Sequence, residues 1–138
     1  MRQQIEVPGE WASIATLLAF TDSLESTAIL SADQCYLLRL VIEEIATNIV
    51  KYGYSEQAPG PIQVTCQYDP PNLAITIRDR GHPFDPRDHP PPDFEAVVTE
   101  RSIGGLGLFF VCDMADEVHY HHDPLSGWNE LTVIKTEA

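Results

Sequence analysis

Residues 34–54 read QCYLLRLVIEEIATNIVKYGY, and this stretch determines most of what the sequence says about the fold. Its apolar residues recur at helical spacing and fill one continuous arc of a helical projection. They are Leu37, Leu38, Val41, Ile42, Ile45, Ile49 and Tyr52. Ser31, followed three residues later by Gln34, fits a capping box, and Gly53 fits a C-cap. We therefore predict a helix from Asp33 to about Tyr52 with one face in a core.

Polar residues of this helix lie at the margin of its apolar arc. Glu44 and Asn48 are four residues apart and therefore share a face, and Lys51 lies on the same side. A carboxylate and a carboxamide at the edge of a core need partners, because an unpaired polar group is costly to bury. Oxygen ligands one turn apart could hold a hard cation such as Mg²⁺, which takes only one or two protein oxygens. Hydrogen bonds to the neighbouring backbone are the alternative.

The other segments also carry helix and strand patterns. In chain order we expect a strand at 3–7, a helix from 11 to about 30, the helix of residues 33–52, a hairpin of 62–68 and 73–79, a helix at 104–115, and strands at 117–122 and 128–135. This order predicts a two-layer α/β (α+β) sandwich with helices on one face of a mixed, mainly antiparallel sheet. We expect one domain over residues 1–138.

Asp79 ends the second strand of the predicted hairpin, and Gly81 follows two residues later. An Asp at that point can accept a hydrogen bond from an exocyclic amine. A neighbouring Gly lets a flat ring approach the backbone, because it has no Cβ. An ordinary Asp-Gly turn explains the same residues.

Glycines precede the helix predicted at 104–115. Gly104, Gly105 and Gly107 would expose backbone N–H groups where the helix starts, which suits phosphates. Glycine turns before helices are also common without any ligand. The segment 80–103 before them holds five of the eleven prolines and few aliphatic residues. Long irregular segments inside compact domains are usually functional lids or disordered.

Composition excludes several classes of function. Acidic residues outnumber basic ones by 21 to 8, which gives a net charge of −13 and leaves no basic footprint for nucleic acid or an anionic membrane. No signal peptide or membrane-spanning run is present in the sequence. Three widely spaced cysteines form neither a disulfide framework nor a metal motif, so we expect a cytoplasmic protein. We interpret His119, His121 and His122 as side chains of a solvent-facing strand rather than as a metal site.

Each of these signals is ambiguous, but their order is not. A Glu/Asn helix, an Asp-x-Gly after a strand, and a loop ending in Gly-Gly-Leu-Gly before a helix resemble the GHKL (Bergerat-fold) ATPases, and most closely the anti-sigma-factor serine kinases. EEIATNIVKYGY (43–54) is similar to the N box of that superfamily, DRGHPFDP (79–86) to its adenine motif, and GGLGLFFVCDMADEV (104–118) to its glycine-rich motif.

The resemblance implies a role for each matching residue. Glu44 would be the general base, Asn48 would bind Mg²⁺, Asp79 would accept from the adenine amino group, and Gly81 would pack beside the ring. Gly105, Leu106 and Gly107 would form the phosphate turn, and residues 85–103 the ATP lid. Lys51 would be a phosphate neighbour. The threonine that often assists adenine binding from a late strand has no clean match, and Thr132 is a candidate.

The resemblance also implies partners and activity. We expect an ATP- and Mg²⁺-dependent protein-serine kinase that sequesters a sigma factor and phosphorylates an anti-anti-sigma (STAS-type) protein, with a homodimer compatible with the family. One rival is a module in which ATP only shapes a partner surface. A second is an interaction domain that has lost the nucleotide, and retention of Glu44, Asn48, Asp79 and Gly107 argues against it.

Overall fold

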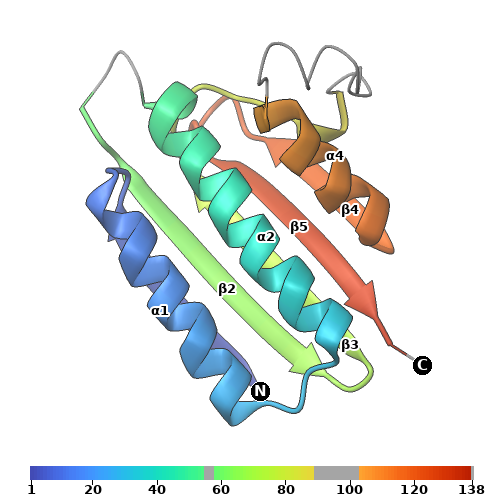
Figure 1. The fold of residues 1–138 in the computed structure, drawn as a ribbon. Coiled ribbons are helices and arrows are strands. Elements are labelled where there is room, and N and C mark those ends of the chain that lie inside the picture. The colour runs from blue at the N-terminus through green and yellow to red at the C-terminus, as the bar shows by residue number, and fades with distance from the viewer. Residues whose placement is uncertain (55–57, 89–102, 138) are drawn as a thin grey trace.

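A computed structural model describes residues 1–54, 58–88 and 103–137 (Figure 1). Its elements, in chain order, are β1 (Arg2–Pro8), α1 (Ala12–Thr27), α2 (Ala32–Asn48), a π-helical turn (Ile49–Gly53), β2 (Pro61–Asp69), β3 (Asn72–Asp79), a 3₁₀ turn (Pro86–Asp88), α4 (Ile103–Met114), β4 (Glu117–His122) and β5 (Asn129–Thr136). The predicted order of helices and strands is confirmed. Most of the predicted lid, residues 89–102, lies outside the described residues.

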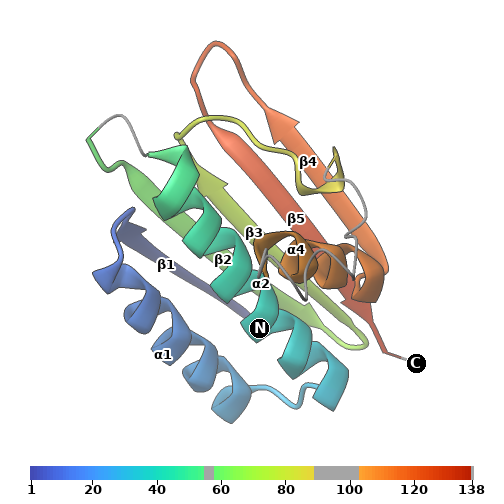
Figure 2. The same cartoon turned by 45° about the horizontal axis from the view of Figure 1, so that its top comes forward.

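The five strands form one sheet in the order β1-β2-β3-β5-β4. All four neighbouring pairs are antiparallel, so the described strands include no parallel pairing. In both views, α1, α2 and α4 lie over the same face of this sheet, with α2 between the other two (Figures 1 and 2). The predicted two-layer sandwich with helices on one face is therefore confirmed.

The start of α2 is fixed by the capping box that the sequence indicates. The Ser31 hydroxyl accepts from the backbone N–H of Gln34, and the Gln34 side chain accepts from the backbone N–H of Ser31, both at 3.0 Å. The buried amide group of Gln34 also donates to the carbonyls of Pro71 and Lys135, at 2.9 and 3.1 Å. One side chain thus caps the helix and ties it to the β2–β3 turn and to β5.

The core lies between α2 and the centre of the sheet. Leu37, Leu38, Val41 and Ile42 are fully buried, against strand residues that alternate inward along β2, β3 and β5. Burying an aliphatic side chain of this size contributes about 1.5–3 kcal/mol. The side chains of this one helix therefore anchor the helical layer.

The end of α2 differs from the prediction. The α-helix stops at Asn48, and residues 49–53 form a π turn in which the N–H of Tyr54 donates to the carbonyl of Ile49 at 3.0 Å. Gly53 follows the helix as expected but does not adopt a positive φ. A π turn inserts an extra residue per turn, and such turns are frequent at functional sites. Here it carries Tyr52 and Gly53 to a pocket.

The opposite face of the sheet is not covered by any described helix. Neighbouring strands place matching residues side by side on it, and Thr65, Thr76 and Thr132 form one such row. The hydroxyls of Thr76 and Thr132 are 3.1 Å apart and hydrogen-bonded. The sheet thus has an apolar face under the helices and a polar face away from them. No helix among the described residues is both long and apolar enough to span a membrane.

Candidate functional site

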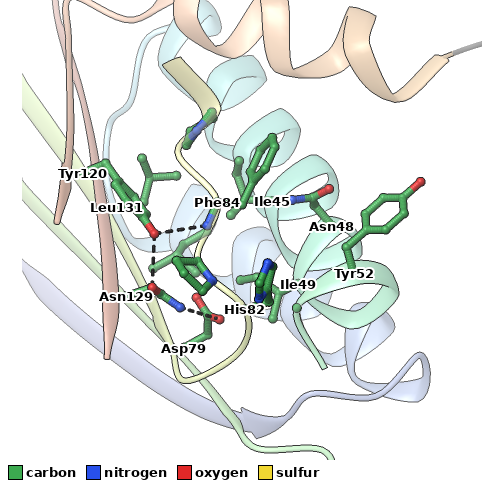
Figure 3. Close-up of a pocket in the computed structure, with 14 residues that line it drawn as sticks. Ile45, Asn48, Ile49, Tyr52, Asp79, His82, Phe84, Tyr120, Asn129 and Leu131 are labelled. Carbon is green, nitrogen blue, oxygen red and sulfur yellow. Dashed lines mark hydrogen bonds between the residues drawn. The ribbon is translucent and has the colours of Figure 1, made fainter. Parts of the chain in front are cut away.

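A pocket opens where the carboxyl end of β3 meets the end of α2 and the start of β5 (Figure 3). It encloses about 590 Å³ of space when the open solvent at its mouth is included. Its lining is mainly apolar, with a few polar groups. The lining residues are Ile45, Asn48, Ile49, Tyr52, Gly53, Ile77, Asp79, His82, Pro83, Phe84, Pro86, Tyr120, Asn129 and Leu131.

Asp79 is the buried acid of this pocket, with 7% of its surface exposed. The backbone N–H of Gly81 donates to its Oδ2 at 2.9 Å, and the Asn129 amide donates to the same oxygen at 3.3 Å. Burial raises the pKa of Asp79, and these two hydrogen bonds and nearby His122 oppose the rise. Because the hydrogen bonds from described residues all reach Oδ2, Oδ1 remains an acceptor for a ligand.

Asn129 links Asp79 to the edge strand β4 (Figure 3). It is 4% exposed, and its carbonyl oxygen accepts from the Tyr120 hydroxyl at 3.1 Å and contacts His122 Nδ1 at 2.7 Å. The Tyr120 hydroxyl in turn accepts from the backbone N–H of Phe84 at 3.1 Å. A continuous polar network therefore runs from β4 through β5 to the acid at the end of β3.

Glu44 lies outside the pocket lining, one helical turn before Asn48, and it contacts α4. A β-carbon at Gly107 would overlap the Glu44 carboxylate, so the absence of a side chain at Gly107 makes room for that group. Partial burial raises the pKa of Glu44, and the neighbouring Glu43 adds to the rise. The structure thus brings together two residues that the sequence connects only through the family resemblance.

The glycines before α4 are placed differently from the simplest expectation. Because α4 begins at Ile103, Gly105 and Leu106 belong to its first turn, at the end of the helix where backbone N–H groups are exposed to a ligand. Gly107 is the fifth residue of α4, so its N–H lies in the ladder of helical hydrogen bonds. Gly107 is instead the contact surface for Glu44.

Asn48 lines the pocket from α2. Its side chain has no hydrogen bond to another described residue, so its amide oxygen remains available. Among the described residues, no cluster of three or more His, Cys, Asp or Glu side chains could hold a metal ion. A single amide oxygen suits an ion that takes one protein oxygen and completes its shell with phosphate and water, as Mg²⁺ can.

Gly81 has a neighbour that the sequence does not reveal. A β-carbon on Gly81 would lie 2.7 Å from the backbone of Gly53, and the N–H of His82 donates to the Gly53 carbonyl at 2.8 Å. The requirement for glycine therefore includes close packing of the β3 end on the π turn. This packing holds Asp79 and the helix end at the same pocket wall.

Of the predicted site residues, Asn48 and Asp79 belong to the described pocket lining and the others do not; the side chains of Lys51 and Thr132 make their contacts elsewhere. Lys51 is exposed, with its Nζ 5.2 Å from the centre of the Tyr52 ring. Thr132 lies on the polar face of the sheet, bonded to Thr76, whereas Asn129 and Leu131 of the same strand face the pocket. Thr132 therefore lies on the face away from the pocket, because successive side chains of a strand point to opposite faces.

The sequence reasoning missed Tyr120 and Asn129. A signal for both was present, because Asn129 is in phase with the buried Leu131 and Val133 of β5. Tyr120 and His122 are likewise on the inward side of β4, while His119 and His121 are exposed. A polar residue at an inward-facing position of a strand, paired with an Asp on the neighbouring strand, is a sign of a buried hydrogen-bond network.

The fold is that of the ATPase domain found in histidine kinases. The chain belongs to the histidine kinase-like ATPase domain family, whose model matches residues 7–135. The resemblance inferred from the three motifs is confirmed.

Curated relatives include serine-protein kinases. The chain is 32% identical to the serine-protein kinase RsbW of Bacillus licheniformis over 98 residues, covering 67% of this chain and 61% of the relative. It is 27% identical to RsbW of Listeria monocytogenes, covering 87% and 78%. It is 26% identical to the serine/threonine-protein kinase BtrW of Bordetella bronchiseptica, covering 78% and 75%. The chain thus spans about three fifths of the length of the first of these relatives.

A solved structure supports the fold independently. The histidine kinase AdeS of Acinetobacter baumannii aligns with a TM-score of 0.50 at 11% identity, covering 97% of this chain and 68% of that one. At this identity the likeness concerns the fold alone.

Proposed function

We propose that this domain binds Mg-ATP and acts as an anti-sigma protein-serine kinase, which sequesters a sigma factor and phosphorylates an anti-anti-sigma protein of the STAS type. The observation that carries the nucleotide proposal is the free acceptor of Asp79, buried in a mainly apolar pocket. A planar, apolar ring with one exocyclic amine matches that lining, because the amine satisfies Oδ1 while the ring excludes water. The serine-protein kinase names of the relatives support the transfer step.

The same pocket wall supplies groups for the phosphates. Asn48 would hold Mg²⁺ through its amide oxygen, and the ion would neutralise charge on the phosphate oxygens. The first-turn amides of α4, at Gly105 and Leu106, would donate to the phosphates. We also propose Lys51 as a phosphate neighbour. Its exposed side chain would have to change rotamer to reach a phosphate.

Glu44 is the proposed general base. Its carboxylate would take the proton of the partner's serine hydroxyl while that oxygen bonds to the γ-phosphorus and the bond to the β-phosphate oxygen breaks, releasing ADP. A raised pKa makes this carboxylate a stronger proton acceptor, since basicity follows pKa. Contact with Gly107 places the carboxylate beside α4, the helix whose first turn would face the phosphates.

The decisive experiment is Glu44→Gln, measured for phosphate transfer and for nucleotide affinity in parallel. The substituted amide keeps the shape and contacts of the Glu44 side chain but cannot accept a proton, so transfer should fall ~10²- to 10⁴-fold with Mg-ATP affinity retained. Asn48→Ala should instead weaken Mg-dependent nucleotide binding itself. The substrate is a purified anti-anti-sigma protein, and labelled phosphate on its serine is the readout.

Two results would contradict this assignment in different ways. If wild-type protein binds ATP and its partner but transfers no phosphate, the kinase assignment is wrong. The rival function then applies, in which ATP only shapes a partner-binding surface. If Glu44→Gln transfers phosphate at the wild-type rate, the protein is still a kinase, but Glu44 is not its general base.

A further inference from the structure

The carboxamide of Asn129 is the centre of the polar network at the pocket floor. Its nitrogen donates to Gly81 O at 2.9 Å and to Asp79 Oδ2 at 3.3 Å. Its oxygen is 3.1 Å from the Tyr120 hydroxyl and 2.7 Å from His122 Nδ1. Two donors and two acceptor positions are all that a carboxamide has, so each is used.

These partners leave only one orientation for the amide. The carbonyl of Gly81 can only accept, so the Asn129 nitrogen must face it. The carbonyl oxygen then faces β4, which requires the Tyr120 hydroxyl to donate and Nδ1 of His122 to carry a proton. A flipped amide would lose the bond to Gly81 and place two acceptors, its own oxygen and Asp79 Oδ2, against each other.

The fixed amide determines what Asp79 can offer to a ligand. Together with the N–H of Gly81 it holds Oδ2, and Oδ1 of this pocket-lining residue is left without a hydrogen bond from a described residue. The same hydrogen bond stabilises the ionised carboxylate against burial, which by itself raises the pKa of Asp79. An ionised carboxylate only accepts, whereas a neutral carboxyl group can also donate.

We propose that Asn129 is the positioning residue that makes this pocket select a 6-aminopurine nucleotide over a 6-oxopurine nucleotide. The proposal rests on the nucleotide binding proposed above. A 6-oxo group needs a donor, but both donors of Asn129 are occupied and Asp79 is held as an acceptor. Without Asn129, Asp79 loses one of its two fixed bonds, and its neutral form becomes more accessible. That form can donate to a 6-oxo group, so selectivity should decrease beyond any general loss of affinity.

The test compares Mg-ADP with Mg-inosine diphosphate, which carry an amino and an oxo group at position 6. Affinities are measured by calorimetry for wild type, Asn129→Ala and the similar-sized Asn129→Leu. We expect wild type to prefer Mg-ADP, and each variant to lose about tenfold or more of that preference, the range expected for one buried hydrogen bond. Thr132→Val, three residues later on the other face of β5, should leave the preference unchanged.

The ratio of the two affinities separates positioning from a merely structural role. General loosening of the pocket would weaken both nucleotides equally and keep the ratio, which would overturn the proposal. Wild-type protein that binds both nucleotides equally would also overturn it, and this measurement needs no variant to fold. Wild-type protein that binds neither nucleotide would instead refute the proposed function on which the inference rests.

Discussion

At the scale of single residues, Asp79 has two properties that act in opposite directions. Its burial provides an acceptor in an apolar pocket, but burial also disfavours the carboxylate and raises its pKa. A group with a raised folded-state pKa contributes stability at low pH that is lost as the pH rises through that pKa. The acid at the site therefore destabilises the unliganded domain at neutral pH.

Asp79→Asn should separate these two effects. The variant has no charge to bury, so its free energy of unfolding relative to wild type should increase as the pH rises from about 4 to 7, the window above the ordinary value of 3.8. Its affinity for Mg-ATP should fall by an amount equivalent to about 1–3 kcal/mol, because the amide oxygen would accept from the Gly81 N–H and the amide nitrogen, which cannot accept, would replace Oδ1. Urea denaturation across this pH range and titration of a fluorescent ATP analogue provide the measurements.

The exposed Asp113 of α4 is a matched control for that experiment. Asp113→Asn also removes one carboxylate, and we expect wild-type nucleotide affinity and no comparable gain in stability. Wild-type nucleotide affinity in Asp79→Asn would remove Asp79 from the site.

At the scale of elements, two glycine contacts hold the site together, and they differ in what they touch. Gly81 of the segment after β3 packs on the backbone of Gly53, whereas Gly107 of α4 packs on the Glu44 side chain. Backbone cannot move aside without displacing the π turn, but a Glu side chain can change rotamer.

Gly81→Ala should therefore destabilise the domain by about 1–3 kcal/mol, as overpacking does, and weaken nucleotide binding. Gly107→Ala should be close to neutral for stability, because the helix gains about 1 kcal/mol from alanine while Glu44 is displaced, but it should lower phosphate transfer. Chemical denaturation and the transfer assay test both.

Gly53→Ala probes the Gly81 contact from the other side. A β-carbon there would meet its neighbours at 3.5–3.8 Å, which is ordinary contact, so only a small loss of stability is expected. Equal losses in Gly81→Ala and Gly107→Ala would contradict the distinction between backbone and side-chain contacts.

The elements themselves were largely predictable, and the reason is local. The capping box at Ser31, the helical arc of residues 34–52 and the alternation of β2 and β3 are patterns that a segment carries on its own. The π turn was not predictable from its own residues, and its contact partner Gly81 comes from the distant segment after β3. Thr132 lies on the outer face of β5, a placement that the apolar residues Leu131 and Val133 on either side of it already indicate.

At the scale of the whole molecule, Mg-ATP should stabilise the domain against heat. Ligand at a hundredfold excess over its dissociation constant adds about 2.7 kcal/mol if only the folded state binds, which raises Tm by several degrees. Thermal melts with and without nucleotide measure this.

The net charge of −13 dictates the control. A strongly acidic chain repels itself, so any added cation stabilises it somewhat by screening. Melts must therefore be compared with Mg²⁺ alone at equal ionic strength. No further increase in Tm with millimolar Mg-ATP would contradict nucleotide binding.

The uncovered polar face of the sheet has a consequence for how such a chain can change over time. Along β5, Asn129, Leu131 and Val133 serve the pocket and core, while Glu130, Thr132 and Ile134 between them point to the other side. Two sets of requirements are thus interleaved in one strand, one residue apart. Substitutions on the outer set can alter what the surface recognises without passing through the nucleotide site. A lineage of such domains can therefore acquire new surface chemistry while its inner set stays constant.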